Sequence, residues 1–333
     1  MVFRSLVPSV LSCWSLCTVL ILAGQGPNRA LADELRWKFA TGDRYAVTYE
    51  QQVEQTTKVL LKPVTIETHS KIEMEWEVLG VDSDGNATIR QRFSGLELTI
   101  RSSRGDFLEF DSSVDDAETG KGSEVGKVLM PLMEAPYEIT MSPRGEILKV
   151  EVPETSLEEI RQSASSMRLR RLFSEESLVE TLSFVAVTLP EGEVSPGESW
   201  ESERAAGTPE LPLTVSHRFT YERGPVDSIE PIELEEEGTP EARLVDSPDD
   251  AAAARVGIET TVAMGDPDAE REDGSRLAKL TQQTSRGSLW FDLEAGHPRR
   301  AVQIQELVTE TPLREMTIEV RGKTSTVTTV VKQ

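Results

Sequence analysis

Histidine is the side chain most often used for metal binding and for proton transfer near neutral pH, and this chain has only three. They are His69, His217 and His297, and no two share a spacing that would bring two ligands to one metal. His217 belongs to an alternating apolar segment, His69 has polar neighbours, and His297 lies in a Gly-His-Pro turn. We therefore expect three separate histidines at the surface or at the edge of a core, and no metal site.

Nucleophile and phosphate-binding motifs are also missing from the sequence. There is no G-x-S-x-G elbow, no G-x-x-x-x-G-K-[ST] loop and no G-x-G-x-x-G fingerprint. The 58 Asp and Glu residues could include a glycosidase-like carboxylate pair, but no pair is distinguished by its spacing. The sequence predicts a protein that is not an enzyme, with no catalytic residue and no cofactor. A hydrolase with an unrecognised carboxylate pair is the third hypothesis.

Two acidic segments could bind calcium. The string Asp-Ser-Asp-Gly-Asn at 82–86 resembles the start of a calcium loop, but the later bidentate Glu is missing and strands flank it. A hairpin turn is the better interpretation. The acids of 264–275 could hold calcium loosely, and a solvated loop is the alternative for that segment.

The first 32 residues have the three regions of a secretory signal peptide. Arg4 precedes an uncharged apolar run at 10–23, and the small-residue pattern Ala30-Leu31-Ala32 ends just before the first acid. The run is too short and too interrupted for a membrane span, and no later segment is apolar enough for one. We expect cleavage near Ala32 and an exported protein, periplasmic or extracellular.

Both cysteines, Cys13 and Cys17, lie within this peptide, so the mature chain would have no disulfide and no thiolate. A lipoprotein anchor on one of them is the competing interpretation. Cleavage would also remove two arginines and no acid, taking the formal charge from −23 to −25. So acidic a surface repels nucleic acid, because neutralising phosphates requires clustered Lys and Arg.

Period-two alternation dominates the chain from residue 35 onward. Apolar residues alternate with polar ones at 35–39, 45–53, 72–78, 87–100 and 213–221, which is typical of antiparallel strands with one solvated face. A hairpin is expected at 137–152, turning on Ser142-Pro143-Arg144-Gly145, and further strands at 287–293, 301–308 and 316–331. The fold class is mostly β: a curved antiparallel sheet, as a half-barrel or a sandwich.

The middle of the chain changes period. Ser156 and Glu159 form a capping box, and Leu157, Ile160, Ala164 and Met167 recur at helical spacing. The sequence thus predicts a short helical insertion at 154–183 between a first β module at 33–153 and a second at 184–333. Two acidic segments of the second module, 233–250 and 264–275, are expected to be loops.

A weak internal repeat raises the alternative of two related β modules. Residues 39–45 and 194–200 share the pattern apolar, two residues, Gly, acid, one residue, aromatic. Recurring hairpin chemistry would explain the same match without any duplication, so one domain or two remain alternatives.

Five segments carry a resemblance to a known family: LRWKFATGDRYAV at 35–47, PYEITMSPRGEILKVEVP at 136–153, FSEESL at 173–178, LPEGEVSPGESW at 189–200 and GSLWFDLEAGHPRRA at 287–301. The chain resembles a family of exported β-rich proteins of unknown function from planctomycete-type bacteria. The likeness covers nearly all of the chain after residue 32, except the acidic stretch 233–275. It implies no catalytic residue, because the family has no assigned activity.

Three functions follow as hypotheses. The first is a non-enzymatic binding or carrier protein of the cell envelope, whose curved sheet holds a lipid or other apolar ligand. Its site would comprise Trp37, Tyr45, Met74, Trp76, Phe219 and Tyr221, with Leu157 and Ile160 as a lid. The second is an envelope or surface structural protein acting through contacts with another envelope protein. The hydrolase above is the third.

Overall fold

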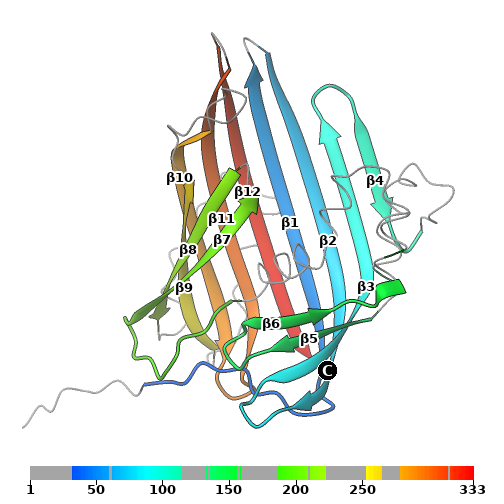
Figure 1. Cartoon of the computed structure of the whole chain (residues 1–333), viewed down its shortest axis with the longest axis vertical. Helices are drawn as coiled ribbons and strands as arrows, with labels where there is room; N and C mark the ends of the chain where they lie inside the picture. The colour runs from blue at the N-terminus through cyan, green and yellow to red at the C-terminus, as the bar shows by residue number, and fades with distance from the viewer. Residues whose placement is uncertain are drawn as a thin grey trace, which may run out of the picture. The chain divides into compact units, whose positions relative to one another are not determined.

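Twelve antiparallel strands form one sheet in the part of the chain that the computed structural model describes (Figure 1). That part comprises residues 32–59, 62–114, 133, 136–155, 158, 187–208, 211–222, 253–264, 278–313 and 316–333. The strands are β1 (Arg44–Val59), β2 (Lys62–Val81), β3 (Ala87–Ser102), β4 (Phe107–Asp111), β5 (Tyr137–Met141), β6 (Ile147–Glu151), β7 (Ser199–Thr208), β8 (Leu211–Glu222), β9 (Ala253–Met264), β10 (Lys279–Asp292), β11 (His297–Leu313) and β12 (Met316–Lys332).

The first and last long strands meet in the middle of the sheet. Its order is β6-β5-β3-β2-β1-β12-β11-β10-β9-β8-β7, with β4 added beside β3. The β1–β12 pairing runs from Tyr45↔Lys332 to Lys58↔Glu319. The expected antiparallel, mostly β fold is confirmed. The sandwich alternative is wrong, because the strands of both expected β regions belong to one sheet.

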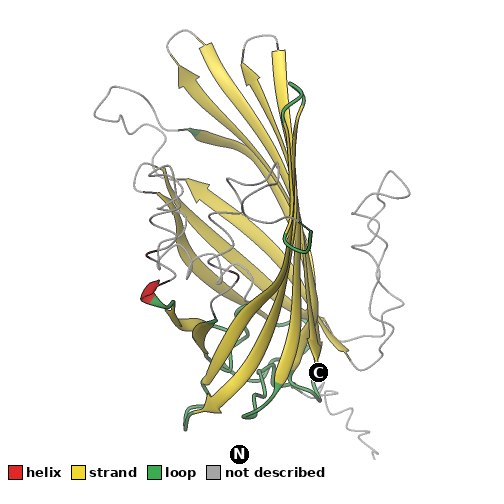
Figure 2. Ribbon diagram, turned by 90° about the vertical axis from the view of Figure 1, so that its right-hand side faces the viewer, coloured by secondary structure: helices red, strands yellow, loops and turns green. Residues whose placement is uncertain are grey.

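The sheet curls, so that β5–β6 at one edge and β7–β8 at the other lie over the same face of the central strands (Figures 1 and 2). Register shifts interrupt the pairing at Glu73/Met74, Val78/Gly80 and Trp290/Phe291. An extra residue on one strand bends it and increases its twist, so these positions favour curvature. The edge strands β6 and β7 do not pair with each other, and the curled sheet stays open.

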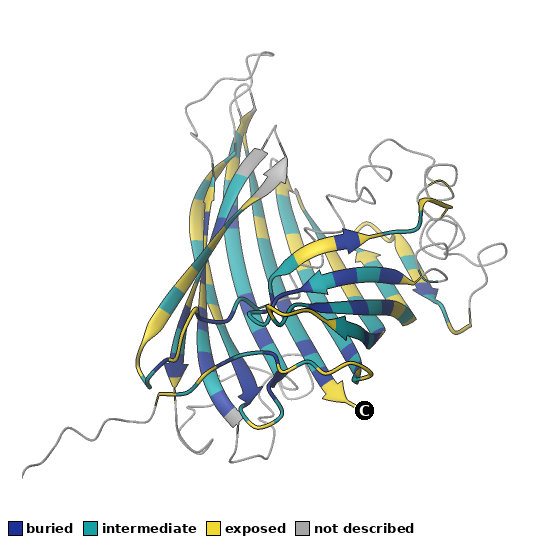
Figure 3. Cartoon of the chain, turned by 60° about the horizontal axis from the view of Figure 1, so that its bottom comes forward, coloured by how far each residue is buried: buried dark blue, intermediate teal, exposed yellow. Residues whose placement is uncertain are grey.

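Alternation gives the sheet two chemically different faces, which we call the inner and outer face. The inner face carries the apolar core, in which Tyr45, Val47, Met74 and Trp76 are at most 8% exposed. Figure 3 shows these buried residues gathered toward one end of the strands. The core therefore fills only that end of the inner face.

The segment 33–39 closes the packed end of the core, although its alternation predicted a strand. It crosses the strand ends instead: the Trp37 N–H donates to the Pro143 carbonyl and the Lys38 N–H to the Gly296 carbonyl, each at 2.8 Å. The indole of Trp37 stacks on Phe39 at 5.1 Å and meets Tyr45 edge-on at 5.8 Å. The strand prediction at 35–39 was wrong because alternation reports two-sided packing and does not identify the hydrogen-bonding partner.

The two matching sequence segments adopt the same local structure. Gly42 and Gly197 have φ values of +90° and +88°. The Gly42 N–H donates to the Val78 carbonyl on β2 at 2.8 Å, and the Gly197 N–H to the Tyr221 carbonyl on β8 at 2.7 Å. The two turns therefore share a local structure as well as a sequence pattern. The strands that follow them, β1 and β7, belong to the same sheet.

Several expectations concern residues outside those described. The helical insertion at 154–183 is described only at 154, 155 and 158, so Leu157 and Ile160 cannot be placed. The same holds for the signal peptide up to residue 31 and for the acidic segments 233–250 and 265–275.

Candidate ligand-binding site

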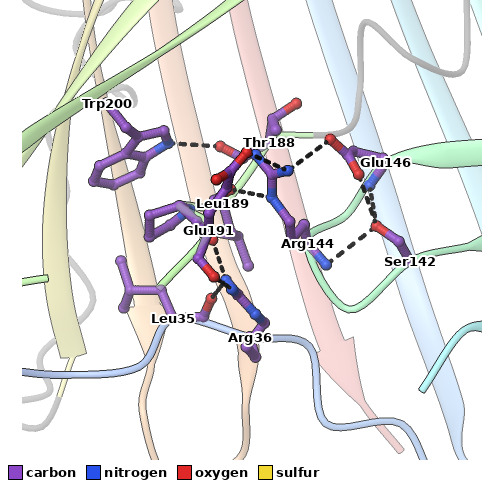
Figure 4. A network of polar contacts seen from close by, with 10 residues as sticks. Leu35, Arg36, Ser142, Arg144, Glu146, Thr188, Leu189, Glu191 and Trp200 are labelled. Atoms are coloured by element: carbon purple, nitrogen blue, oxygen red, sulfur yellow. Dashed lines mark hydrogen bonds and ion pairs between the residues drawn. The ribbon is translucent and has the colours of Figure 1, made fainter. Parts of the chain in front are cut away.

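A short segment bridges the two edges of the open sheet. We call residues 187–194 the strap. Its Leu189 N–H donates to the Arg144 carbonyl at 2.8 Å, and Arg144 Nε donates to the Leu189 carbonyl at 3.0 Å, which joins the strap to the β5–β6 turn. At its other side the Thr188 carbonyl accepts from the Trp200 indole on β7 at 2.9 Å (Figure 4). The strap thus connects β5–β6 to β7 where the strands themselves do not pair.

The strap is also tied to the segment 33–39. Asp33 and Val194 exchange two backbone hydrogen bonds of 2.9 Å. Arg36 donates to the carbonyls of Pro190 and Glu191. These contacts attach the strap to the segment that covers the packed end of the core.

A pocket of about 380 Å³ lies beside the strap. This volume is within the range of small-molecule sites. Its lining combines apolar and polar residues. The apolar side chains are Ile147, Val187, Phe219 and Ile258, and the polar or charged ones are Arg144, Glu146, Thr188, Glu201, Ser202, Glu203, Arg204, His217 and Gln303. The pocket can therefore accept a ligand that has both an apolar and a polar part.

The polar part of the pocket is a connected hydrogen-bond network. The Gln303 amide donates to Thr260 Oγ1 at 2.6 Å, and that hydroxyl lies 2.8 Å from His217 Nδ1. The Thr260 hydroxyl has one proton and two lone pairs, so it can either donate to His217 Nδ1 or accept from it. The network therefore ties the imidazole to Thr260 and leaves Nε2 for a ligand.

Burial and charge keep His217 neutral. Burial of the ring and, to a smaller extent, the positive charge of Arg204 together lower the pKa of His217 to about 4. Both effects disfavour the imidazolium, since one removes its solvation and the other repels it. His217 is consequently an uncharged hydrogen-bonding group at neutral pH.

Charge is distributed very unequally over the two faces of the sheet. Ion pairs on the outer face join neighbouring strands, such as Lys58–Glu319 at 2.8 Å and Lys71–Glu97 at 3.4 Å. The described inner-face positions of β1, β3 and β9, and those of β2 from Val64 to Gly80, carry no Asp, Glu, Lys or Arg. On β12 the inner face has one such residue, Lys332 at the strand end, which pairs with Asp43 at 2.8 Å.

Arg204 stands out against this uncharged background. It pairs in register with Val215 on β8 and follows Trp200 and Ser202 on the inner face of β7. A charge on an otherwise apolar face is costly to desolvate, and such positions are commonly functional. Period-two spacing places Arg204 on the same face as Trp200 and Ser202, but so mixed a set of side chains does not by itself indicate an inner face.

Six of the residues expected to line a ligand site come together in the apolar core: Trp37, Tyr45, Met74, Trp76, Phe219 and Tyr221. Phe219 also lines the pocket. Trp37 and Trp76 border a void of only about 30 Å³, far too small for an acyl chain. The other pocket residues, Ser202, Arg204, Gln303 and the strap, were not anticipated from the sequence.

The three histidines differ more than expected. His69 is exposed, whereas His297 is 5% exposed and lies against Trp37 and Tyr45, with ring centroids 6.2 and 5.6 Å apart. Of the two positions expected for a histidine, surface or core edge, His297 has the second, because the segment 33–39 covers its turn. Within the described residues, no three His, Cys, Asp or Glu side chains are grouped so that they could hold a metal ion.

Comparison with protein families gives one match. Residues 84–224 match the model of a family of unknown function (DUF6263). This stretch runs from the β2–β3 turn to just beyond β8 and includes the strap, Arg144, Arg204 and His217. The coarse expectation of an uncharacterised family is confirmed, while the bacterial group and export stay predictions. No curated protein matches the sequence.

Solved structures with some likeness are remote. Lipovitellin, in a structure concerned with its lipid–protein interactions, is 10% identical with a TM-score of 0.43; the alignment covers 89% of this chain and 25% of that one. The COG4313 outer membrane channel from Pseudomonas putida F1 is 8% identical with a TM-score of 0.19, over 89% and 97% of the two chains. Pseudomonas aeruginosa OpdQ is 6% identical with a TM-score of 0.21, over 87% and 99%.

This chain therefore spans about a quarter of the lipovitellin chain. Likenesses at these TM-scores carry no information about a ligand. No helix among the described residues has the length and apolar character needed to cross a bilayer. The site itself is thus the basis for assigning a function.

Proposed function

We propose that this chain is an exported, non-catalytic binding or carrier protein of the cell envelope that holds an amphiphilic ligand on the inner face of its curled sheet. The observation that carries the proposal is the pocket beside the strap. There Phe219 and Ile258 supply an apolar wall while Ser202, His217 and Gln303 supply uncharged hydrogen-bonding groups. A purely apolar ligand would leave those polar groups without partners, so the pocket fits an amphiphile better.

The absence of charge on the described inner-face positions of β1, β3 and β9, and on those of β2 from Val64 to Gly80, supports the same function. An apolar chain can lie along an uncharged surface without desolvating ions, whereas on the outer face it would displace water from many Glu and Lys side chains. His217 itself adds no charge to the pocket, because burial, with a smaller effect of Arg204, lowers its pKa to about 4. The inner face is therefore suited to the apolar part of the ligand, and the pocket is suited to its polar group.

Native mass spectrometry tests the proposal directly. The full chain is exported by a bacterial host, purified gently and measured before and after organic extraction. We expect a species with extra mass that extraction removes, and an N-terminus at Asp33 if the signal peptide is cleaved after Ala32. A bare mass, unchanged after incubation with envelope lipids, would refute the carrier function.

A pair of variants localises the bound mass. Ser202→Phe places a large side chain in the pocket, whereas Ser199→Phe places the same side chain on the outer face of β7, where Ser199 is exposed. We expect Ser202→Phe to lose the extra mass and Ser199→Phe to keep it. Loss in both variants would indicate a general defect of β7, and retention in both would place the ligand elsewhere.

A second candidate is an envelope protein that acts through protein contacts. Leu148 on the outermost strand β6 is 54% exposed, and an edge strand with an exposed apolar side chain is a potential pairing surface. This function predicts association that Leu148→Lys abolishes. Light scattering or crosslinking in the envelope would distinguish it from the carrier function, which predicts no effect of this substitution.

A further inference from the structure

We infer that the ligand is an amphiphile with a single anionic head group, carboxylate or phosphate, and that Arg204 is the residue that selects this head group. The inference rests on the proposed function and adds the chemical class of the ligand. It is carried by the position of Arg204, a guanidinium in the pocket. The described inner-face positions of β1, β3 and β9, and those of β2 from Val64 to Gly80, have no charge.

The pocket combines donors of the kind that an anion needs. Arg204 offers a planar set of N–H groups, which suits carboxylate and phosphate oxygens. His217 contacts Thr260 through Nδ1 and keeps Nε2 as a second polar atom of the pocket. Three carboxylates also line the pocket, and each contacts another residue. Glu203 accepts from Ser216 at 3.2 Å and Glu201 lies 3.9 Å from Arg218, both on the outer face of β7–β8, while Glu146 lies 3.3 Å from Arg144.

The second arginine of the pocket has a different task. Arg144 Nη1 lies 3.3 Å from Glu146 and 3.7 Å from Glu191, and its Nε holds the strap carbonyl of Leu189 at 3.0 Å (Figure 4). Its charge is balanced by these acids and its geometry serves the strap. Head-group selection is assigned to Arg204 because of its position on the inner face of β7, where its charge also acts on His217.

The apolar part of the ligand has a defined direction as well. Phe219 and Ile258 lie next to each other in register, and Gly287 pairs with Ile258 and Gln303 across β9, β10 and β11. A Cβ at Gly287 would come within 2.7 Å of the Val302 carbonyl and 3.3 Å of Ile258 Cβ. Because Gly287 has no side chain, no atoms beyond the backbone fill the position between Ile258 and Gln303.

The overall charge of the protein makes the selection easy to recognise. With a formal charge of −23, the chain as a whole repels anions. A preference for an anionic over a neutral amphiphile of equal chain length would therefore have to arise locally. Long-range attraction cannot produce it.

The test is a displacement titration with the full chain, using the neutral fluorophore N-phenyl-1-naphthylamine as the reporter. Dodecanoate, dodecyl phosphate and dodecan-1-ol, each below its solubility limit, compete for the probe. We expect the two anions to bind roughly 10-fold more tightly than the alcohol, and Arg204→Met to remove that difference. A tenfold preference corresponds to about 1.4 kcal/mol.

Arg218→Met is the matched control. Arg218 lies on the outer face of the same β7–β8 pair, 3.9 Å from Glu201, so removing it changes the net charge equally without touching the inner face. We expect the anion preference to persist in this variant. Its loss in both variants would assign the preference to net charge and overturn the role of Arg204.

The other outcomes separate the two proposals. Equal binding of the anions and the alcohol to the unmodified chain would overturn the head-group inference and leave the carrier function standing. An anion preference that survives Arg204→Met would likewise overturn the assignment to Arg204. Failure of all three amphiphiles to displace the probe would count against the carrier function itself. A stronger effect on dodecyl phosphate than on dodecanoate would identify phosphate as the favoured head group.

Discussion

The inner face of the sheet is packed at one end and hollow near the strap, although the same strands build both regions. At the packed end Tyr45, Trp76 and Leu289 are 0%, 8% and 0% exposed and lie under the segment 33–39. Near the strap, inner-face positions further along these and neighbouring strands hold His217, Thr260 and Gln303, joined by hydrogen bonds around a pocket.

The difference shows that alternation alone does not distinguish a core from a binding surface. Both regions satisfy period two, but aromatic and aliphatic side chains fill the first, whereas amides and hydroxyls line the second. A cover makes the first region a core: the Trp37 indole stacks there on Phe39 and lies 6.1 Å from the Trp76 ring. At the second region the strap bridges the sheet edges and leaves about 380 Å³ unfilled.

The largest expected effect sharpens this comparison at the packed end. Trp76→Ala removes a buried indole whose Nε1 donates to Gln91 Oε1 at 3.0 Å, and we expect it to lower the free energy of unfolding by about 3–5 kcal/mol. Trp200→Ala, near the strap, should cost less, because Trp200 is only half-buried. Urea unfolding of both variants measures the difference, and equal losses would contradict the distinction between the two regions.

The second effect is pH dependence near the strap. The folded pKa of His217, about 4, lies below the unfolded value of 6.5, so protons bind preferentially to the unfolded chain between these values. Stability contributed by neutral His217 is complete above pH 6.5 and falls as the pH drops toward 4, by an amount on the order of 3 kcal/mol.

Unfolding measured from pH 7 to pH 4 in the unmodified protein and in His217→Asn isolates this contribution. The Asn amide can still reach Thr260 but does not titrate. We expect the variant to lose less stability over this interval, and identical pH profiles would show that His217 is not held neutral. The buried carboxylates titrate in both proteins and cancel in the difference.

A third, smaller effect concerns the contact between strap and β5–β6 turn. Gly145 has φ +82°, and a Cβ there would lie 2.6 Å from the Val187 carbonyl. Gly42 has φ +90° but open space around it. Left-handed backbone costs alanine about 1 kcal/mol at either position. We expect Gly42→Ala to lose about that much stability and Gly145→Ala about 2–3 kcal/mol, since the backbone carbonyl has to move.

Thermal unfolding compares the two variants, and a ligand-displacement titration adds a second readout. Displacement of Val187 should disturb the pocket, so Gly145→Ala is expected to weaken ligand binding while Gly42→Ala leaves it unchanged. Equal losses of stability in the two variants would mean that the Val187 carbonyl moves away from a Cβ at position 145 at little energetic cost.

The smallest effect is expected on the outer face. Lys58 and Glu319 approach to 2.8 Å, but their side chains are 54% and 32% exposed, so solvent screens the pair. Lys58→Ala should change the free energy of unfolding by less than about 0.5 kcal/mol. A loss above 1 kcal/mol in urea unfolding would show that ion pairs on the outer face stabilise the sheet more than solvent-screened pairs are expected to.

Much of the fold could be predicted because hairpins are local. The turn at 82–86 joins β2 to β3, and Ser142–Gly145 joins β5 to β6, as their Asp-Gly and Pro-Arg-Gly strings indicated. Local turn chemistry and alternation over a few residues were sufficient for both. The pairing of β1 with β12 joins residues nearly a whole chain apart, and no short pattern records such a partner.

The candidate site could be predicted only in part. Its apolar residues carry a pattern, so Phe219 was anticipated. Its polar residues are ordinary in sequence: Ser202, Arg204 and Gln303 resemble any solvent-facing residues until the register of β7–β8 and β10–β11 assigns them to the inner face. The strap posed the same difficulty, since its partners Arg144 and Trp200 lie on different edges of the sheet.

By itself the sequence determined the strands, their turns and the separation of apolar from charged faces, because each depends on neighbours within a few residues. Only the tertiary structure decided that a single curled sheet forms, that residues 33–39 cover one end of its inner face, and that the strap leaves a pocket at the seam. Those outcomes depend on which distant backbone groups find hydrogen-bond partners, and a carbonyl such as that of Pro143 or Thr188 looks the same in every sequence.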